Sequence, residues 1–174
     1  MTRWLTRMAL FAAAACTAGC SGCGDDSEAP GVLTFIPAAG SEAPAVYLQS
    51  SGLEGGHLRL DVMGRGLSDV YGVAFRLEYD GTSLAPAEWT PAAFWPSDAI
   101  SIGRQAEPGL FVVGLTHRGQ VPGAPADDHA LGTIDCTVTR PTPIRFVAGH
   151  GAVVDSDGLE ASGVTWLGGE IDWR

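Results

Sequence analysis

The sequence predicts an all-β protein, a sandwich or barrel of about nine strands. From residue 32 onward, apolar and polar residues alternate with a period of two, in short segments separated by Gly, Pro, Asp and Ser. The 174 residues include 24 Gly and 11 Pro, and one of these residues interrupts every stretch long enough for a stable helix. The same residues provide the turns that many short strands need.

The candidate strands, in chain order, are residues 33–36, 46–49, 57–63, 73–79, 84–89, 99–103, 110–115, 133–139, 144–148 and 164–173. The alternation is clearest where Leu58, Leu60 and Val62 share one face and polar residues take the other. Residues 110–115 are apolar on both faces, which predicts a strand in the middle of a sheet with a covering layer on each side.

Three further expectations concern a loop and two core residues. Residues 118–129 are rich in Gly and Pro and are expected to form a long surface loop. Cys136 lies on the inward face of its strand, which predicts a buried structural thiol rather than a nucleophile. Trp173 shares a strand face with Ile171, so it is expected to lie in the core.

The amino terminus has the layout of an export signal. Arg3 and Arg7 precede an apolar stretch at residues 8–18 that ends in small residues. A membrane-spanning helix needs about 20 apolar residues, so this stretch is too short for a transmembrane anchor. The segment Thr17-Ala18-Gly19-Cys20 is similar to a bacterial lipobox, which predicts cleavage before Cys20 and lipidation of that residue.

Two alternatives remain open at this end, namely ordinary cleavage among the small residues and lipidation at Cys16 or Cys23. The expected organisation is a lipoprotein signal peptide at 1–19, the lipidated Cys and a flexible tether at 20–31, and one β-sandwich domain at 32–174. The protein is therefore expected to be exported and held on the cell envelope by its lipid. Because Ser21 rather than Asp follows Cys20, the outer membrane or cell surface is the expected site.

The charge balance limits the possible partners. All 10 basic residues are Arg, and 20 Asp and Glu residues give a net charge of −10. An acidic surface repels phosphate, which excludes nucleic acid as a partner. It also opposes adsorption to anionic lipid headgroups, so any contact with a membrane is expected through the lipid anchor only.

Nothing in the sequence predicts catalysis or a cofactor. The four His residues are dispersed without metal-ligand spacing, and no nucleophile elbow, phosphate loop or dinucleotide fingerprint is present. Asp155 and Asp157 resemble the start of a calcium loop, but no Glu follows at the required distance. A hairpin turn at Asp157-Gly158 is the simpler interpretation, with a metal site at Asp155 and Asp157 as a weak alternative.

Aromatic residues gather in one Pro-stiffened stretch, where Trp89, Phe94 and Trp95 lie within seven positions. Rings exposed on a surface could stack on sugars, which predicts a carbohydrate site. The other interpretation is that they close one end of the sandwich as part of the core.

Several segments together resemble cohesin domains. Residues 69–80, Asp-Val-Tyr-Gly-Val-Ala-Phe-Arg-Leu-Glu-Tyr-Asp, resemble the third cohesin strand, where a Gly precedes alternating apolar residues and a Tyr-Asp turn. Residues 110–115 resemble the central strand of the family, and residues 130–138 resemble the strand that follows it. Thr142-Pro143-Ile144 and Asp155-Ser156-Asp157-Gly158 then come in the expected order. The resemblance extends over about residues 45–173.

This resemblance implies a nine-stranded jelly-roll sandwich of the superfamily that also contains carbohydrate-binding modules. Cohesins are non-catalytic and bind dockerin modules on one sheet face, and calcium belongs to the dockerin. The expected function is thus a non-catalytic adhesion or adaptor module on a membrane-anchored lipoprotein, with a dockerin-like partner and a link to polysaccharide binding or degradation. The expected partner-binding residues are on polar strand faces: His57, Arg59, Arg76 and Glu78. The alternatives are a carbohydrate-binding module that uses Trp89, Phe94 and Trp95, and a structural envelope lipoprotein without a ligand.

Overall fold

The computed structural model describes residues 31–174, which form one compact unit of fourteen β-strands and no α-helix. The predicted all-β class is therefore confirmed, and each candidate strand overlaps an observed one. Within this part of the chain, no helix is long and apolar enough to cross a membrane. The signal peptide, Cys20 and the tether expected at 1–30 lie outside the described residues.

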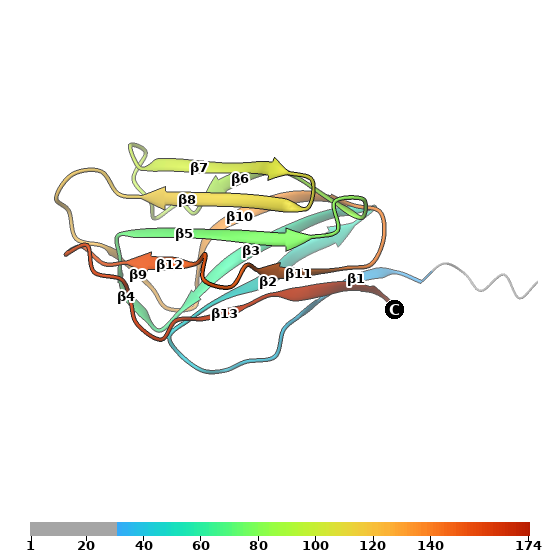
Figure 1. Ribbon diagram of the computed structural model, residues 1–174, viewed down its shortest axis with the longest axis horizontal. Coiled ribbons are helices and arrows are strands. Elements are labelled where there is room, and N and C mark those ends of the chain that lie inside the picture. The colour runs from blue at the N-terminus through green and yellow to red at the C-terminus, as the bar shows by residue number, and fades with distance from the viewer. Residues whose placement is uncertain (1–30) are drawn as a thin grey trace, which may run out of the picture. The chain divides into compact units, whose positions relative to one another are not determined.

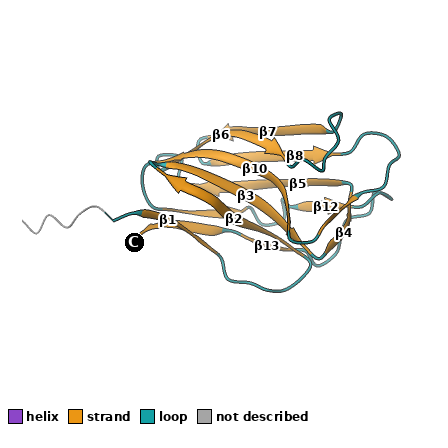
Figure 2. Ribbon diagram, turned by 180° about the vertical axis from the view of Figure 1, so that it is seen from behind, coloured by secondary structure: helices purple, strands orange, loops and turns teal. Residues whose placement is uncertain are grey.

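Most strands belong to two sheets that pack as the layers of a sandwich (Figure 1). The larger sheet has the spatial order β1 (Leu33–Pro37), β14 (Gly169–Trp173), β11 (Thr142–Phe146), β5 (Gly72–Tyr79), β8 (Leu110–Thr116) and β7 (Ile100–Glu107), with β12 (Ala152–Val154) also paired to β5. The smaller sheet has the order β13 (Thr165–Leu167), β2 (Ala45–Glu54), β3 (His57–Arg65), β10 (His129–Val138) and β6 (Leu84–Pro91), and it forms the near layer in Figure 2.

A third, two-stranded sheet joins β4 (Leu67–Val70) to β9 (Ala124–Ala126). The stretch 118–129, expected to be a loop throughout, therefore contains a strand, and its last residue begins β10. The alternation of side chains did not predict β4, β9 or β12, because strands of three or four residues are too short to show a period.

The core lies between the two large sheets. Its centre is Phe75 on β5, whose ring packs edge-on against Trp89 of the opposite sheet, with ring centroids 5.9 Å apart. Phe146 and Trp166 approach the same ring at 5.4 and 6.3 Å. Side chains that alternate along β3, β5, β8 and β10 supply much of the rest of the core: Leu58, Leu60, Val62, Val73, Leu77, Phe111, Val113, Leu115, Ile134, Cys136 and Val138. Burial of this apolar area is the main term that stabilises the fold.

The two ends of the described chain are paired with each other. Val32 N–H donates to Arg174 O at 2.7 Å, and Arg174 N–H donates to Val32 O at 2.9 Å. The C terminus therefore lies beside the start of β1 in Figure 1. Trp173 is 47% exposed at this end, so the expectation that it lies in the core is wrong. It is the last residue of β14, where the strand runs out of the sandwich.

Candidate functional site

The outer face of β12, β5, β8 and β7 carries two large apolar side chains that are exposed to solvent. Ile100 and Ile102 project from β7 and are 50% and 55% exposed. Their exposure has a local cause, because the intervening Ser101 and Gly103 face inward against Trp89. The small inward residues leave room for the indole, and the alternation of the strand then places the two Ile side chains in solvent.

Strand register extends this apolar surface across the sheet. Ile102 lies opposite Gly114 of β8, Gly114 lies opposite Ala74 of β5, and Ala74 lies opposite Ala152 of β12. The neighbouring row of register partners crosses the same four strands, from Ile100 on β7 to Val154 on β12. Together these residues border a shallow hollow of about 290 Å³. We call the following set the apolar patch: Ala74, Ile100, Ile102, Gly114, Ala152 and Val154.

No described element covers the apolar patch. In Figure 1, β5, β8 and β7 form the near layer, with β10 and β3 behind them. The prediction that residues 110–115 occupy the middle of a sheet is confirmed, since β8 lies between β5 and β7. The expected second covering layer is wrong, because the described chain leaves Val112 and Gly114 half-exposed on the outer side. An uncovered apolar surface of this kind is typical of a site that another molecule covers.

Charged side chains occupy the other half of the same face. Arg76 of β5 and Arg104 of β7 both lie opposite Val112 of β8, one on each side. The row beyond them holds Glu78 and Glu107, both opposite Leu110. The face is thus divided along the strands into an apolar part and a charged part.

The four partner-binding residues expected from the sequence do not form one site. Arg76 and Glu78 lie on the charged half of this face, whereas His57 and Arg59 lie on β3 of the opposite sheet. All four are exposed, as the alternation predicts. The alternation predicts which side chains point outward but not which sheet a strand joins, so the two pairs point away from each other.

The outer face of the smaller sheet is polar, and several of its groups bind one another. Arg65 Nε donates to Asp128 Oδ1 at 3.3 Å, and its guanidinium carbon lies 4.5 Å from the ring centroid of Tyr47. Thr133 Oγ1 donates to Asp61 Oδ1 at 2.7 Å. The larger side chains on this face, such as Tyr47 and Met63 opposite it, are half-buried, and the face has no apolar side chain as exposed as Ile100 or Ile102.

The aromatic residues considered for sugar binding are mostly buried. Trp89 and Trp95 are 8% and 6% exposed, and their indole N–H groups donate to Ser101 Oγ at 3.1 Å and to Leu131 O at 3.0 Å. Phe94 is half-buried and stacks on Trp95 with ring centroids 5.1 Å apart. Neither indole offers an open face, so the placement favours the interpretation in which they close the sandwich.

The acidic residues considered as a metal site form a hydrogen-bonded turn. Asp155 Oδ1 accepts N–H groups from Asp157 at 3.0 Å and Leu159 at 2.8 Å. Asp69 Oδ2 accepts the hydroxyl of Ser156 at 2.7 Å, which lowers the pKa of the Asp69 carboxyl. Within residues 31–174, no three His, Cys, Asp or Glu side chains converge closely enough to hold a metal ion.

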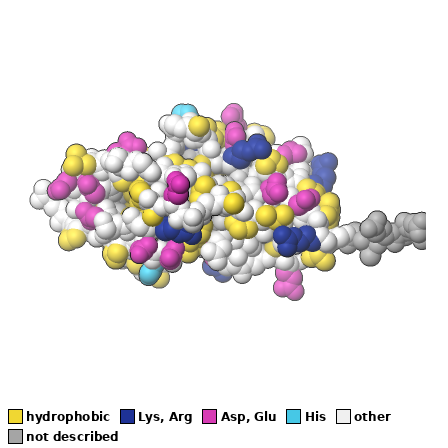
Figure 3. Space-filling model, turned by 90° about the horizontal axis from the view of Figure 1, so that it is seen from below, with side chains coloured by type: hydrophobic (Ala, Val, Ile, Leu, Met, Phe, Trp, Pro, Cys, Tyr) yellow, Lys and Arg dark blue, Asp and Glu magenta, His cyan; other side chains and the backbone are white. Residues whose placement is uncertain are grey.

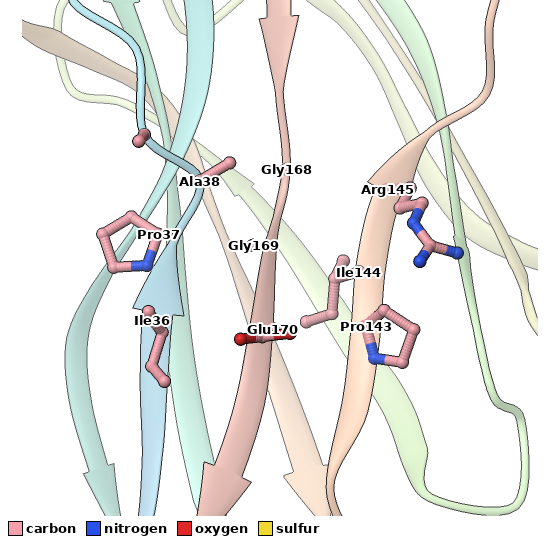
Figure 4. Close-up of a pocket in the computed structure, with 10 residues that line it drawn as sticks. Ile36, Pro37, Ala38, Pro143, Ile144, Arg145, Gly168, Gly169 and Glu170 are labelled. Atoms are coloured by element: carbon pink, nitrogen blue, oxygen red, sulfur yellow. The ribbon is translucent and has the colours of Figure 1, made fainter.

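A second hollow, of about 370 Å³, lies over β1, β14 and β11 (Figure 4). Figure 4 shows Glu170 on β14 between Ile36 on one side and Pro143 on the other. Gly168 and Gly169 also line the hollow, and neither position has room for a Cβ, which would meet Ile144 O or the Phe35 ring. The charged groups that line the hollow are the Glu170 carboxylate and the Arg145 guanidinium, and Glu170 is its one titratable side chain.

Comparison with known proteins gives a fold and no sequence relative. No protein-family model matches the sequence, and no curated protein matches it. The sixth cohesin of scaffoldin B from Acetivibrio cellulolyticus, solved with a dockerin, is similar with a TM-score of 0.58 and 14% identity, over 76% of this chain and 96% of that chain.

Two further solved structures agree. A type I cohesin–dockerin complex from Clostridium thermocellum is similar with a TM-score of 0.57 and 18% identity, over 79% of this chain and 96% of that chain. A type II cohesin domain from the cellulosome of Acetivibrio cellulolyticus has a TM-score of 0.59 and 12% identity, over 80% of this chain and 95% of that chain. Residues 31–174 therefore have the fold of a cohesin domain.

Proposed function

We propose that this chain is a non-catalytic adaptor module that binds a protein partner on the outer face of β12, β5, β8 and β7. The observation that carries the proposal is the exposure of Ile100 and Ile102, which no described part of the chain covers. Burial of apolar area drives most protein association. A partner that covers both Ile side chains therefore forms a more stable complex.

The expected partner is a dockerin-like module. The cohesin fold supports this assignment, and two of the similar structures were solved as complexes with dockerins. Calcium would then belong to the partner, since the described residues of this chain offer no cluster of metal ligands. A link to polysaccharide binding or degradation is part of the proposal, supported by the cellulosomal source of one similar structure.

The adaptor is proposed to be an exported lipoprotein of the cell envelope. The support comes from the sequence at residues 1–20, with two Arg, an apolar stretch and Cys20 after small residues. Growth with a clickable fatty acid tests this step: the full chain should be labelled, Cys20→Ala should abolish the label and Cys23→Ala should keep it. Equal labelling of wild type and Cys20→Ala would contradict lipidation at Cys20.

The docking face is tested by capture with matched variants. Beads carrying residues 31–174 are exposed to envelope and secreted proteins of the native cell, with calcium and then with chelator. The wild type should retain a partner that chelator releases, and Ile102→Asp should lose it. Thr137→Asp adds the same charge to an exposed position of β10 on the opposite sheet, and it should retain the partner.

Other results would contradict parts of the proposal. Equal capture by Ile102→Asp and wild type would exclude this face. Capture of soluble glycan, lost in Trp95→Ala, would favour a carbohydrate-binding module. Absence of any specific protein or glycan would favour a structural envelope lipoprotein.

A further inference from the structure

The charged half of the outer face contains two arginines without an ion-pair partner. The one ion pair among residues 31–174 joins Arg65 to Asp128, on the other sheet. The arginine side chains that donate hydrogen bonds in this part of the chain are Arg65 and Arg140. Arg76 and Arg104 are exposed and belong to neither group. A guanidinium group left in this way is free to bind an anion from outside the chain.

Register places the two free arginines around one point. Both lie opposite Val112, so Arg76, Val112 and Arg104 form a row across three strands, which we call the arginine row. Neighbouring strands are about 4.8 Å apart, so the two Arg backbones are separated by about 10 Å. Arg side chains are long enough to extend over Val112 from both sides, so both guanidinium groups can bind the same carboxylate.

The arginine row directly adjoins the apolar patch. Ile102 is two residues from Arg104 on β7, and Ala74 is two residues from Arg76 on β5. Two residues along a strand correspond to about 7 Å. One turn of a helix advances by about 5.4 Å, which is a similar distance. A partner helix whose apolar side chains cover the patch would therefore present its next turn to the arginine row.

The charges around the arginine row favour one direction for a partner docked on this face. On the side away from the apolar patch lie Glu78 and Glu107, whose carboxylates repel another carboxylate, and Arg145 of β11 lies opposite Glu78 at the far side of that row. The chain as a whole has a net charge of −10, and acidic side chains are scattered over the face shown in Figure 3. Two arginines converge on the arginine row, whereas the next row along these strands holds two glutamates, so an acidic group on a partner is favoured at the arginine row over the row beyond it.

We propose that the arginine row selects the partner: the docked segment is an amphipathic helix that carries an Asp or Glu one turn beyond its apolar stripe. This inference rests on the proposed function, because it uses the same face. It adds the charge that the partner must carry and the direction in which the helix lies.

The test uses a phage library of amphipathic helical peptides with a fixed Leu stripe and randomised flanking positions. Residues 31–174 serve as the target, since they contain every described strand and the whole core. On the wild type, Asp and Glu should be enriched several-fold at the position one turn beyond the stripe. On Arg76→Glu/Arg104→Glu, the enrichment at that position should change to Lys and Arg. The matched control Arg59→Glu, on exposed β3 of the opposite sheet, should keep the preference for acid.

The outcomes separate this inference from the proposed function. Peptides that bind the wild type, are lost on Ile102→Asp and show no preference for acid would overturn the role of the arginine row but leave the docking face in place. Absence of enriched peptides, or enrichment that survives Ile102→Asp, would overturn the docking face and this inference with it. If circular dichroism shows that the double Glu variant is unfolded, Arg76→Gln/Arg104→Gln replaces it, and the preference for acid should disappear.

Discussion

The indole of Trp89 on β6 lies directly against Gly103 on β7, and a Cβ at position 103 would overlap the first atoms of the Trp89 side chain. The two residues belong to different sheets. Their contact, together with the Trp89 to Ser101 hydrogen bond, joins the edges of the sandwich. Gly103 thereby also determines that Ile100 and Ile102 point outward.

Gly103→Val should destabilise the protein by about 1–3 kcal/mol, because the added side chain must push Trp89 out of a packed position. The control is Gly114→Ala on the adjacent strand, where an added Cβ has no neighbour within 4 Å. That variant should stay within about 0.5 kcal/mol of wild type. Urea unfolding measures both, and equal midpoints for the two variants would contradict the packing described for Trp89.

Trp95→Phe should lower the free energy of unfolding by roughly 1–2 kcal/mol. The substitution removes the indole donor that binds Leu131 O at 3.0 Å and leaves space in the core. The matched control is Trp173→Phe, at a position that is 47% exposed and should be nearly neutral. Thermal and urea unfolding distinguish the two, and a neutral Trp95→Phe would show that the buried hydrogen bond is replaced by other contacts.

Cys136 should be unreactive in the native protein. Burial raises the pKa of its thiol to about 12, with a smaller contribution from the charge of Asp135. At about pH 8 only roughly one molecule in ten thousand then carries the reactive thiolate. A chromogenic disulfide reagent should label residues 31–174 slowly in buffer and rapidly in denaturant; rapid native labelling would contradict the burial.

The same pKa shift has a consequence for stability. A thiol whose pKa is higher in the folded than in the unfolded state favours folding fully below the unfolded value, which is near 9.0. That contribution is lost as pH rises toward the folded value. Cys136→Ala should therefore lose less stability than wild type between about pH 9 and about pH 11.

Asp80 should make the turn between β5 and β6 sensitive to acid. Its carboxylate accepts hydrogen bonds from Thr82 N–H and Thr82 Oγ1, both at 2.8 Å, and from Ser83 Oγ at 2.9 Å. These bonds lower the pKa of the Asp80 carboxyl below its ordinary value of 3.8. The stabilisation is present above that value and is lost as pH falls through the folded pKa.

Thermal unfolding between about pH 7 and about pH 2 checks this prediction. The melting temperature of Asp80→Asn should fall less steeply with acid than that of wild type. Asp98→Asn, at an exposed position without a hydrogen bond in this structure, should follow the wild-type curve. Identical acid profiles for wild type and Asp80→Asn would show that this carboxylate does not contribute.

The fold class and the strand faces could be predicted because alternation is a local property. Along β3, Leu58, Leu60 and Val62 are buried as their spacing predicts, and β5 follows the same rule from Val73 to Tyr79. Which sheet a strand joins depends on long-range pairing, which local spacing does not contain. For this reason the residues expected to bind a partner are divided between opposite faces.

The apolar patch could not be predicted for a related reason. The order Ile100, Ser101, Ile102, Gly103 suggests that the two Ile side chains face the core. In the structure the small residues face inward, because Trp89 of the opposite sheet occupies the space beside them. The signal in the sequence was that Ser101 and Gly103 are small enough to pack against Trp89. Recognising it requires knowing that β6 and β7 lie next to each other.

The pairing of the two chain ends determines how the domain resists a pulling force. β1 is antiparallel to β14 over five residue pairs, from Leu33 with Trp173 to Pro37 with Gly169. Hydrogen bonds between antiparallel strands lie perpendicular to the strands. A force applied through Gly31 along β1 therefore loads all of these bonds in shear at the same time, instead of opening them one after another. The pairing of β1 with β14 therefore resists a force that is transmitted from the amino terminus to the sheet on which a partner is proposed to bind.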